Sequence, residues 1–312
     1  MSKEKKKPVK NKIHSRNKNK DRYNLNALLA LNPKLGDYLK PNFKGEEAVD
    51  LSNPTAVKIL NQTLLHYYYG VEHWSFSDQN ICPTIPNRAD YIHYMADVLM
   101  GSNFGNLPNG EKITCLDIGT GATCIYPIIG ITEYNWNFIA SDINAESLES
   151  AKKISKENKA LTHKIDFRLQ EKAKDVIYGT LRKEETIDIA ICNPPFYNSI
   201  EDAKIETLEK GAPYTSLEIT PEIIYNGGEI RFLKQYIKES KAFSKNCFWF
   251  SALVTKKANQ KALPDFLKLV GATDVKTIHI GLGHKSTQML VWTFLSVIEQ
   301  KEWRETKWRT KK

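Results

Sequence analysis

Hydrophobic positions in the second half of the chain fall into short runs, separated by longer stretches with helical spacing. The runs that we expect to form buried strands span 113–117, 138–141, 165–170, 187–192, 248–254, 275–280 and 290–294. Helical periodicity occupies 145–158, 230–243 and 258–270. This alternation predicts an α/β fold, a doubly wound sheet whose ligand lies at the carboxyl ends of the strands. The loop between the last two strands is too short for a crossover helix, so the last strand should be antiparallel.

The first third of the chain has mostly helical spacing. Residues 23–110 are predicted to form a helical module and a linker, ahead of a sheet domain over residues 111–299. Asn53 and Pro54 suit the start of a helix over residues 56–68, as its N-cap and first-turn residue. A second helix is expected from about residue 88 to residue 100. Residues 196–228 show no clear periodicity and are predicted to be an insertion that faces the substrate.

The formal net charge of +9 is concentrated at the two ends of the chain. Residues 1–22 contain ten Lys and Arg against two acidic residues, and residues 300–312 contain six against two. The remaining chain carries −3, and a near-neutral body with two basic tails is typical of a protein that binds a phosphate backbone. We expect the first tail to be disordered until it binds. Tails that only aid solubility are the alternative.

Composition narrows the class of protein further. No apolar run approaches 18 residues and no signal-peptide pattern is present, which predicts a soluble cytoplasmic protein without membrane association. The five cysteines are odd in number and include no C-x-x-C pair, which indicates a reducing compartment and no zinc site. We expect no bound metal and a monomer.

The most distinctive motif is Asn193-Pro194-Pro195-Phe196, directly after the apolar run 187–192. The exocyclic amine of adenine is a poor nucleophile, because its lone pair is delocalised into the ring. The Asn193 side-chain oxygen and the Pro194 carbonyl can accept both amine hydrogens and favour a tetrahedral nitrogen, while the prolines restrict the backbone. Phe196 offers a ring on which the base can stack. Asn193, Pro194 and Phe196 are therefore the candidate catalytic residues, and a rigid structural turn is the alternative.

A second motif, Asp117-Ile118-Gly119-Thr120-Gly121, follows an earlier predicted strand. Gly119 and Gly121 allow a positive φ and a close approach of the backbone to a ligand. Residue 124 is Cys, so the G-x-G-x-x-G fingerprint for a pyrophosphate is incomplete. Asp142 ends the next strand about 20 residues later and suits a ribose diol. A nucleoside without phosphates points to S-adenosyl-L-methionine, although Asp117 and Asp142 could each simply cap a turn.

Further stretches extend these two motifs into a family resemblance. Residues 14–17, 86–93, 117–127, 193–196 and 227–229 resemble the ribosomal large subunit RNA adenine-N6 methyltransferase F family, in one order from about residue 12 to residue 295. More distantly, the chain is similar to the eukaryotic enzyme that methylates hairpin adenines in spliceosomal and messenger RNA. The resemblance implies a Rossmann-like, seven-stranded class I methyltransferase fold. It also implies S-adenosyl-L-methionine as the donor and one adenine of 23S ribosomal RNA as the target.

The resemblance also assigns a donor pocket. It implies that the pocket is lined by Arg88, Gly119, Thr123, Asp142 and Asn193, to which we add Asp117, Gly121 and Gln170. Asp142 stands where relatives often carry Glu, and residues 170–174, expected near the donor adenine, match poorly. From the sequence alone Arg88 could equally pair with Asp90 or Asp97, whereas the resemblance assigns its guanidinium to the methionine carboxylate.

For the acceptor RNA we predict contacts from His14, Arg16, Phe196 and Lys285, and direct SN2 transfer to the amine without a general base. A guanine-N2 RNA methyltransferase and a glutamine-N5 methyltransferase of release factors are alternatives, because both use a similar turn. A non-catalytic RNA-binding scaffold is the third. The basic tails favour RNA over protein, and the intact set of Asp117, Asp142 and Asn193 argues against a scaffold. Only the family resemblance favours adenine over guanine as the target base.

Overall fold

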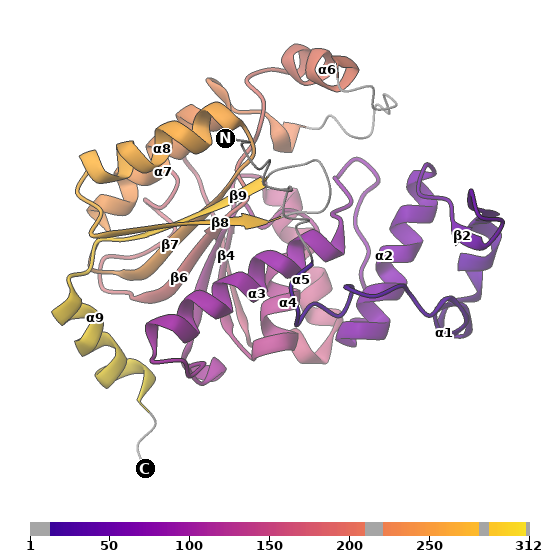
Figure 1. Cartoon of the computed structure of the whole chain (residues 1–312), viewed down its shortest axis with the longest axis horizontal. Coiled ribbons are helices and arrows are strands. Elements are labelled where there is room, and N and C mark those ends of the chain that lie inside the picture. The colour runs from indigo at the N-terminus through magenta and orange to yellow at the C-terminus, as the bar shows by residue number, and fades with distance from the viewer. Residues whose placement is uncertain (1–12, 210–220, 281–286, 310–312) are drawn as a thin grey trace, which may run out of the picture.

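The computed structural model describes residues 13–209, 221–280 and 287–309. Its centre is a seven-stranded sheet of order β5-β4-β3-β6-β7-β9-β8 (Figure 1). The strands are β3 (Thr114–Ile118), β4 (Asn137–Asp142), β5 (Ile165–Leu169), β6 (Ile187–Cys192), β7 (Cys247–Val254), β8 (Asp274–Ile280) and β9 (Thr287–Thr293). All seven predicted strands are present. The last strand, β9, pairs antiparallel with both β7 and β8, as the short connection predicted.

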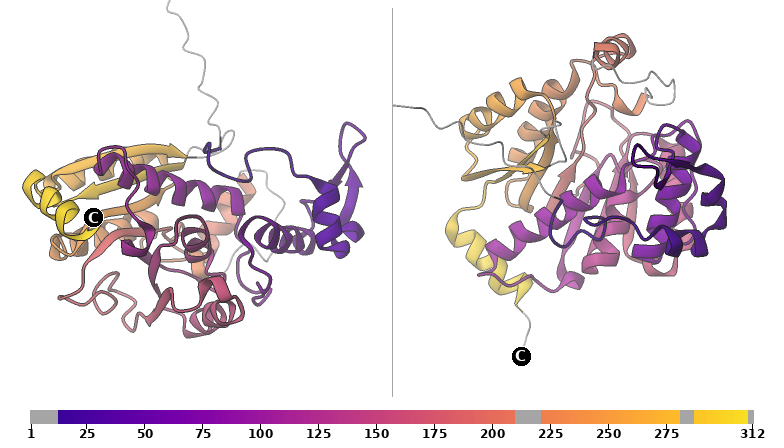
Figure 2. Two further views of the ribbon diagram at one scale, coloured as in Figure 1. Left: turned by 90° about the horizontal axis from the view of Figure 1, so that it is seen from below. Right: turned by 45° about the vertical axis from the view of Figure 1, so that its right-hand side comes forward.

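Helices cover both faces of the sheet (Figures 1 and 2). One face is covered by α3 (Ile85–Ser102), α4 (Ile125–Tyr134) and α5 (Ala145–Glu157), and the other by α7 (Gly228–Ala242) and α8 (Lys257–Leu269). The central strand β6 serves both cores, since Ile189 and Ile191 pack on the α3 side while Ala190 and Cys192 pack on the α7 side. This two-residue alternation follows from the pleat and places the end of β6 between two buried layers.

A smaller lobe precedes α3 and has its own core of Leu28, Leu35, Leu60 and Leu64. It contains α1 (Leu25–Leu31), η1 (Pro33–Tyr38), a hairpin of β1 (Leu39–Pro41) and β2 (Glu47–Val49), and α2 (Pro54–Tyr69). Asn53 caps α2 and Pro54 lies in its first turn, as predicted. The hairpin was not predicted, because strands of three residues carry too few positions to show a two-residue period.

Helix α3 belongs to the main core rather than to the small lobe. Tyr91, Met95 and Leu99 are fully buried with residues of α4 and the sheet. Helix α3, which follows the loop 77–84, therefore packs directly on the sheet and on α4, between which the predicted donor turn lies.

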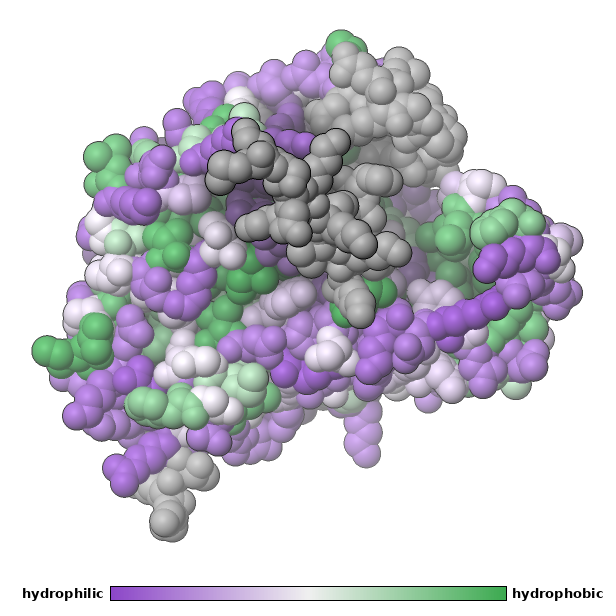
Figure 3. Space-filling view, viewed as in Figure 1, coloured by the Kyte–Doolittle hydropathy of each residue, from purple (hydrophilic) through white to green (hydrophobic). Residues whose placement is uncertain are grey.

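The N-terminal arm, residues 13–20, corrects the prediction of a disordered tail for the residues described. Asn17 Nδ2 donates to Pro86 O and to Asp90 Oδ1, at 2.8 and 2.6 Å, and the backbone N–H of His14 donates to the same carboxylate oxygen at 3.0 Å. The arm is ordered because its polar groups satisfy a buried carboxylate on α3. Figure 3 shows hydrophilic side chains following this segment across the face of the molecule.

Other helices lie where the sequence indicated irregular chain. The insertion contains α6 (Ile200–Glu209) and the short turn η4 (Pro221–Ile223), and the C-terminal basic segment forms α9 (Val297–Trp303) and the π-helical turn η5 (Arg304–Trp308). Trp303 Nε1 and Trp308 Nε1 both donate to Asp188 Oδ1 on β6, at 2.9 and 2.7 Å. These tryptophans hold the segment to the sheet, at the end of β6 opposite Asn193. No helix in the described ranges combines the length and apolar character needed to cross a bilayer.

Candidate active site

A cavity of about 520 Å³ lies at the carboxyl ends of β3, β4 and β6, where the sequence predicted the ligand. Nine of the predicted site residues line it, namely Arg88, Gly119, Gly121, Thr123, Asp142, Gln170, Asn193, Pro194 and Phe196. Donor and acceptor motifs, separated by about 70 residues in sequence, thus face one space. Lys285 lies outside the described residues.

The glycine turn after β3 forms one wall of the cavity. Gly119 and Gly121 have φ values of 75° and 65°, and a Cβ added at either position would meet no atom within 4 Å. The backbone N–H groups of Gly119 and Thr120 both donate to Ser141 O at 2.9 Å, which ties the turn to the end of β4. The open space beside the glycines is room that a side chain would fill, so the turn is a cradle for a ligand.

Asp142 joins the glycine turn to the start of α5. Its carboxylate accepts from the backbone N–H of Gly121 at 2.8 Å and of Asn144 at 2.9 Å. Burial raises the pKa of Asp142, while these backbone donors lower it. The capping role and the ribose role are compatible, because each carboxylate oxygen has a second lone pair available to a diol.

Asp117 differs from the other donor residues, since it lies behind the cavity wall. The residue is fully buried on β3, and neither carboxylate oxygen meets a hydrogen-bond donor in the described part of the chain. Burial raises the pKa of Asp117 to about 7, the nearby Thr120 hydroxyl lowers it, and the Asp142 charge adds to the rise. A buried carboxylate without a partner is costly, and a cationic ligand group would relieve that cost.

Arg88 points to the cavity from the first turns of α3. Its Nη1 donates to Tyr126 Oη at 3.2 Å, and the guanidinium carbon lies 5.7 Å from the Tyr126 ring centroid. The pairing with Asp90 or Asp97 left open by the sequence does not occur, because the N-terminal arm occupies both carboxylates. Most of the Arg88 guanidinium donors are therefore available to a ligand carboxylate.

Gln170 lines the cavity but is also used to build its wall. Its Nε2 donates to Tyr178 O at 2.7 Å, and its Oε1 accepts from the Lys172 backbone N–H at 3.1 Å. The side chain thus braces the loop that follows β5. Its contact with the donor adenine stays a prediction.

The acceptor turn is held from the far end of the insertion. The backbone N–H groups of Phe196 and Tyr197 both donate to Ile223 O at 3.0 Å, and the Tyr225 N–H donates to Tyr197 O at 2.9 Å. The Asn193 side chain has no hydrogen-bond partner among the described residues, although it lines the cavity. Its amide is consequently available to bind an incoming group.

The predicted RNA contacts of the arm serve a different purpose in this structure. His14 is 7% exposed, and its Nε2 lies 2.9 Å from Asp97 Oδ2. Arg16 Nη2 donates to Asp97 Oδ1 at 2.6 Å, and Arg16 Nε donates to Tyr134 Oη at 2.9 Å. Both side chains fasten the arm to α3 and α4, so an RNA contact by His14 would require it to leave a buried position.

Several lining residues were not predicted. They come from the loop before α3 and from the segment before α7, and include Asn80, Glu222 and Tyr225. Asn80 Nδ2 donates to Glu222 Oε1 at 2.5 Å, and Trp74 Nε1 donates to Thr123 O at 2.8 Å. Glu222 and Tyr225 belong to the insertion 196–228, which the sequence predicted to face the substrate, although neither residue was singled out. The loop of Asn80 carries no recognisable motif, so only the tertiary contact reveals it.

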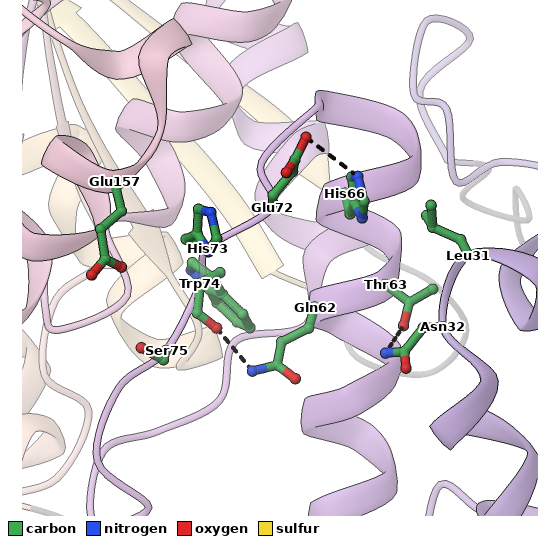
Figure 4. Close-up of a pocket in the computed structure, with 10 residues that line it drawn as sticks. All are labelled: Leu31, Asn32, Gln62, Thr63, His66, Glu72, His73, Trp74, Ser75 and Glu157. Atoms are coloured by element: carbon green, nitrogen blue, oxygen red, sulfur yellow. Dashed lines mark hydrogen bonds and ion pairs between the residues drawn. The ribbon is translucent and has the colours of Figure 1, made fainter.

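A second cavity of about 300 Å³ lies between α1, α2 and the end of α5 (Figure 4). Its side chains bind neighbouring groups, since Asn32 Nδ2 donates to Thr63 Oγ1 at 3.0 Å and Gln62 Nε2 donates to Trp74 O at 2.9 Å. None of the predicted site residues lines it. The bond from Gln62 connects the small lobe to Trp74, which belongs to the main core.

The main cavity fits S-adenosylmethionine in its chemistry. Arg88 suits the carboxylate and Asp142 suits the ribose diol, both from the cavity lining. Asp117 lies behind the wall, where its carboxylate adds negative charge that favours an ammonium group in the cavity. The glycine cradle leaves room for the ligand without a phosphate-binding sequence.

Known proteins with similar sequences and structures agree with this arrangement. The chain is 41% identical to the ribosomal RNA large subunit methyltransferase F of Cytophaga hutchinsonii, over 96% of this chain and 97% of that protein. It is 39% identical to the protein of the same name from Flavobacterium johnsoniae, over 95% and 97% of the two chains.

Two solved structures have the same fold. The human METTL16 catalytic domain in complex with a MAT2A 3′UTR hairpin matches with a TM-score of 0.79 and 28% identity, over 92% of this chain and 96% of that one. The N-terminal domain of human METTL16 in complex with SAH matches with a TM-score of 0.73 and 27% identity, over 91% and 100%. The predicted methyltransferase fold is confirmed. Residues 7–296 match the family model described as RNA methyltransferase, and the chain belongs to this family.

Proposed function

We propose that this RNA methyltransferase transfers the methyl group of S-adenosylmethionine to N6 of one adenine in 23S ribosomal RNA. The observation that carries the proposal is that the glycine turn after β3 and the Asn193–Phe196 turn after β6 line one cavity. The relatives at about 40% identity, which are named ribosomal RNA large subunit methyltransferases, support ribosomal RNA as the substrate. A cytoplasmic location and a monomeric state stay predictions.

The donor half of the site binds and orients the cofactor. When bound, S-adenosylmethionine supplies a methyl group on a sulfonium, whose thioether is a good leaving group. We assign the methionine carboxylate to Arg88 and the ribose diol to Asp142, while Asp117 attracts the ammonium from behind the cavity wall. Gly119 and Gly121 allow close approach of the backbone, and Thr123 lines the same wall.

The acceptor half prepares the amine. Phe196 stacks on an unpaired adenine, and Asn193 Oδ1 and Pro194 O accept its two N–H hydrogens, which directs the nitrogen lone pair at the methyl group. Holding the two groups in line supplies most of the rate, since the leaving group is already activated. The methylated nitrogen then loses a proton to solvent, so no general base is needed.

The test is nucleoside analysis by mass spectrometry after incubation of 23S RNA with the protein and isotopically labelled donor. The proposal expects one labelled N6-methyladenosine for each 23S RNA molecule. Label in N2-methylguanosine would replace adenine with guanine as the target, and label only in a release factor would identify a glutamine methyltransferase. No transfer to any of these substrates would favour a non-catalytic scaffold.

A further inference from the structure

The sheet opens between β6 and β7 just before the catalytic turn. On its other side β6 stays paired with β3 as far as Cys192, which lies opposite Ile118. Towards β7 the last paired residue is Ala190, opposite Phe250. Backbone groups of β6 that face this opening need partners from elsewhere, because unpaired buried polar groups are costly.

Tyr91 of α3 and Ser251 of β7 provide those partners. The Cys192 N–H donates to Tyr91 Oη at 3.2 Å, Tyr91 Oη lies 2.8 Å from Ser251 Oγ, and Ser251 Oγ donates to Ala190 O at 2.9 Å. Since the Ser251 proton goes to Ala190, the Tyr91 hydroxyl donates to Ser251 and accepts from Cys192. A longer contact of 3.5 Å joins Tyr91 Oη to Cys192 O. The hydroxyls of Tyr91 and Ser251 thus take the place of the missing backbone hydrogen bonds between β6 and β7. Each group donates to the next, from the Cys192 N–H to the Ala190 carbonyl.

This chain acts at the residue next to the proposed acceptor. Cys192 directly precedes Asn193, and Cys192, Tyr91 and Ser251 are all 1% exposed or less. A buried hydrogen-bonded network of this kind has one low-energy arrangement and resists displacement. The hydroxyl of Tyr91 therefore restrains the peptide from which the Asn193 side chain projects.

The same helix also carries the donor-binding arginine. Arg88 lies one turn before Tyr91 on α3, and the Tyr91 ring packs edge-on against Tyr126, which accepts from Arg88. Helix α3, which lies across the sheet in Figure 1, thus contacts the donor half of the site through Arg88 and the acceptor half through Tyr91. The N-terminal arm fastens the first turns of this helix through Asn17.

We propose that Tyr91 is a positioning residue for methyl transfer, which sets the end of β6, and so Asn193 and Pro194, in register with the donor bound near Arg88. The inference rests on the proposed function for its effect on rate. It adds a residue on α3, outside the sheet itself, that does not line the cavity.

The test compares Tyr91→Phe with Tyr236→Phe as the matched control. Tyr236 is equally buried and its Oη donates to Ser251 O at 3.4 Å, but it lies on α7 and makes no hydrogen bond to Cys192 among the described residues. We expect Tyr91→Phe to lower kcat about 10- to 100-fold, because a small misplacement of reacting groups has effects of this size. The Kd values for S-adenosylmethionine and RNA should stay within about threefold, and Tyr236→Phe should keep nearly full kcat.

Hydrogen exchange of the Cys192 amide gives a readout that needs no substrate. Exchange should be faster in Tyr91→Phe than in the wild type or in Tyr236→Phe. Unchanged exchange would overturn the restraint itself. Faster exchange with wild-type kcat would overturn the role in transfer, as would an equal loss of kcat in Tyr236→Phe. A wild type that transfers no methyl group to RNA would instead count against the proposed function.

A second variant covers the case in which Tyr91→Phe does not fold. Ser251→Ala keeps the bond between Cys192 and Tyr91 but removes the group that orients the Tyr91 hydroxyl. It should lower kcat in the same direction by a smaller factor, with unchanged donor affinity. Wild-type kcat in a folded Ser251→Ala would contradict the proposal.

Discussion

Asn80 and Glu222 form a hydrogen bond of 2.5 Å, from Nδ2 to Oε1, that joins two walls of the catalytic cavity. Asn80 belongs to the loop before α3, and Glu222 directly precedes Ile223, whose carbonyl accepts from Phe196 and Tyr197. The bond therefore connects the loop 77–84, which precedes α3, with the segment that supports the acceptor turn.

Replacing Glu222 should separate RNA binding from donor binding. We expect Glu222→Ala to raise the KM for RNA about tenfold, since a hydrogen bond to a charged group contributes roughly 1.5–3 kcal/mol and part of this acts on the acceptor turn. Glu222→Gln keeps an acceptor for Asn80 Nδ2 and should stay within about threefold of wild type. Steady-state kinetics of the wild type and the two variants makes the comparison. Equal KM values for RNA in all three proteins would show that the bond between Asn80 and Glu222 does not support RNA binding.

Asn193→Ala should abolish methyl transfer and leave the Kd for S-adenosylmethionine within several-fold of wild type. The reason is that the Asn193 amide acts on the acceptor amine in the transition state. Single-turnover assays with calorimetry of donor binding separate the two effects. Turnover close to wild type would remove Asn193 from the catalytic set.

Asp142→Ala should weaken S-adenosylmethionine binding by about 1.5–3 kcal/mol, through loss of hydrogen bonds from the ribose. The variant also frees the Gly121 and Asn144 N–H groups, so Asp142→Asn is the control that retains one acceptor oxygen. Calorimetry should rank wild type above Asn and Asn above Ala, with RNA affinity little changed. If all three bound the donor equally, Asp142 would be a structural cap only.

Asp117 predicts a pH dependence of stability with a defined sign. Its pKa of about 7 in the folded protein exceeds the ordinary value of 3.8, so the folded state binds a proton that the unfolded state lacks between about pH 4 and pH 7. Stability contributed by this group therefore falls as the pH rises through that window. Relative to Asp117→Asn, wild type should be less stable at pH 8 than at pH 5.

Urea unfolding of wild type and Asp117→Asn at pH 5 and pH 8 measures that difference. The same variant should bind S-adenosylmethionine more weakly, because the ammonium group loses its carboxylate. A stability difference that is the same at both pH values would show that Asp117 does not titrate in this range.

The two parts of the basic N-terminus should behave differently on deletion. Residues 1–12 contain six lysines, so their removal should flatten the dependence of RNA affinity on salt, by about 0.7 in slope for each phosphate of single-stranded RNA that these lysines neutralise. Donor affinity should not change. Deletion of residues 1–20 should in addition weaken donor binding and lower Tm, because it removes the Asn17 bonds to α3.

Filter binding of RNA at several salt concentrations, with calorimetry of the donor, tests both deletions. Equal salt slopes for wild type and the shorter deletion would assign the RNA contacts to other lysines. Unchanged donor affinity in the longer deletion would show that α3 does not depend on the arm.

Local patterns in the sequence were sufficient for the sheet and for the donor and acceptor turns of the cavity. The seven strands, the antiparallel last strand and the two turns at strand ends follow from short-range features, because a strand's period and a turn's Gly or Pro are properties of neighbouring residues. The same features predicted that Gly119, Asp142 and Asn193 would meet, since carboxyl ends of parallel strands lie at one edge.

Tertiary structure decided which other segments complete the site. Asn80 and Glu222 are separated by 142 residues, and Tyr91 and Cys192 by 101, so no local pattern could pair them. The buried position of His14 and the two bonds from Trp303 and Trp308 to Asp188 likewise depend on a polar partner that only folding provides. The composition showed only that the two ends of the chain are basic. The need to satisfy buried Asp90 and Asp188 determined that residues 13–20 and 297–308 pack against the body, because a buried polar group without a partner is costly.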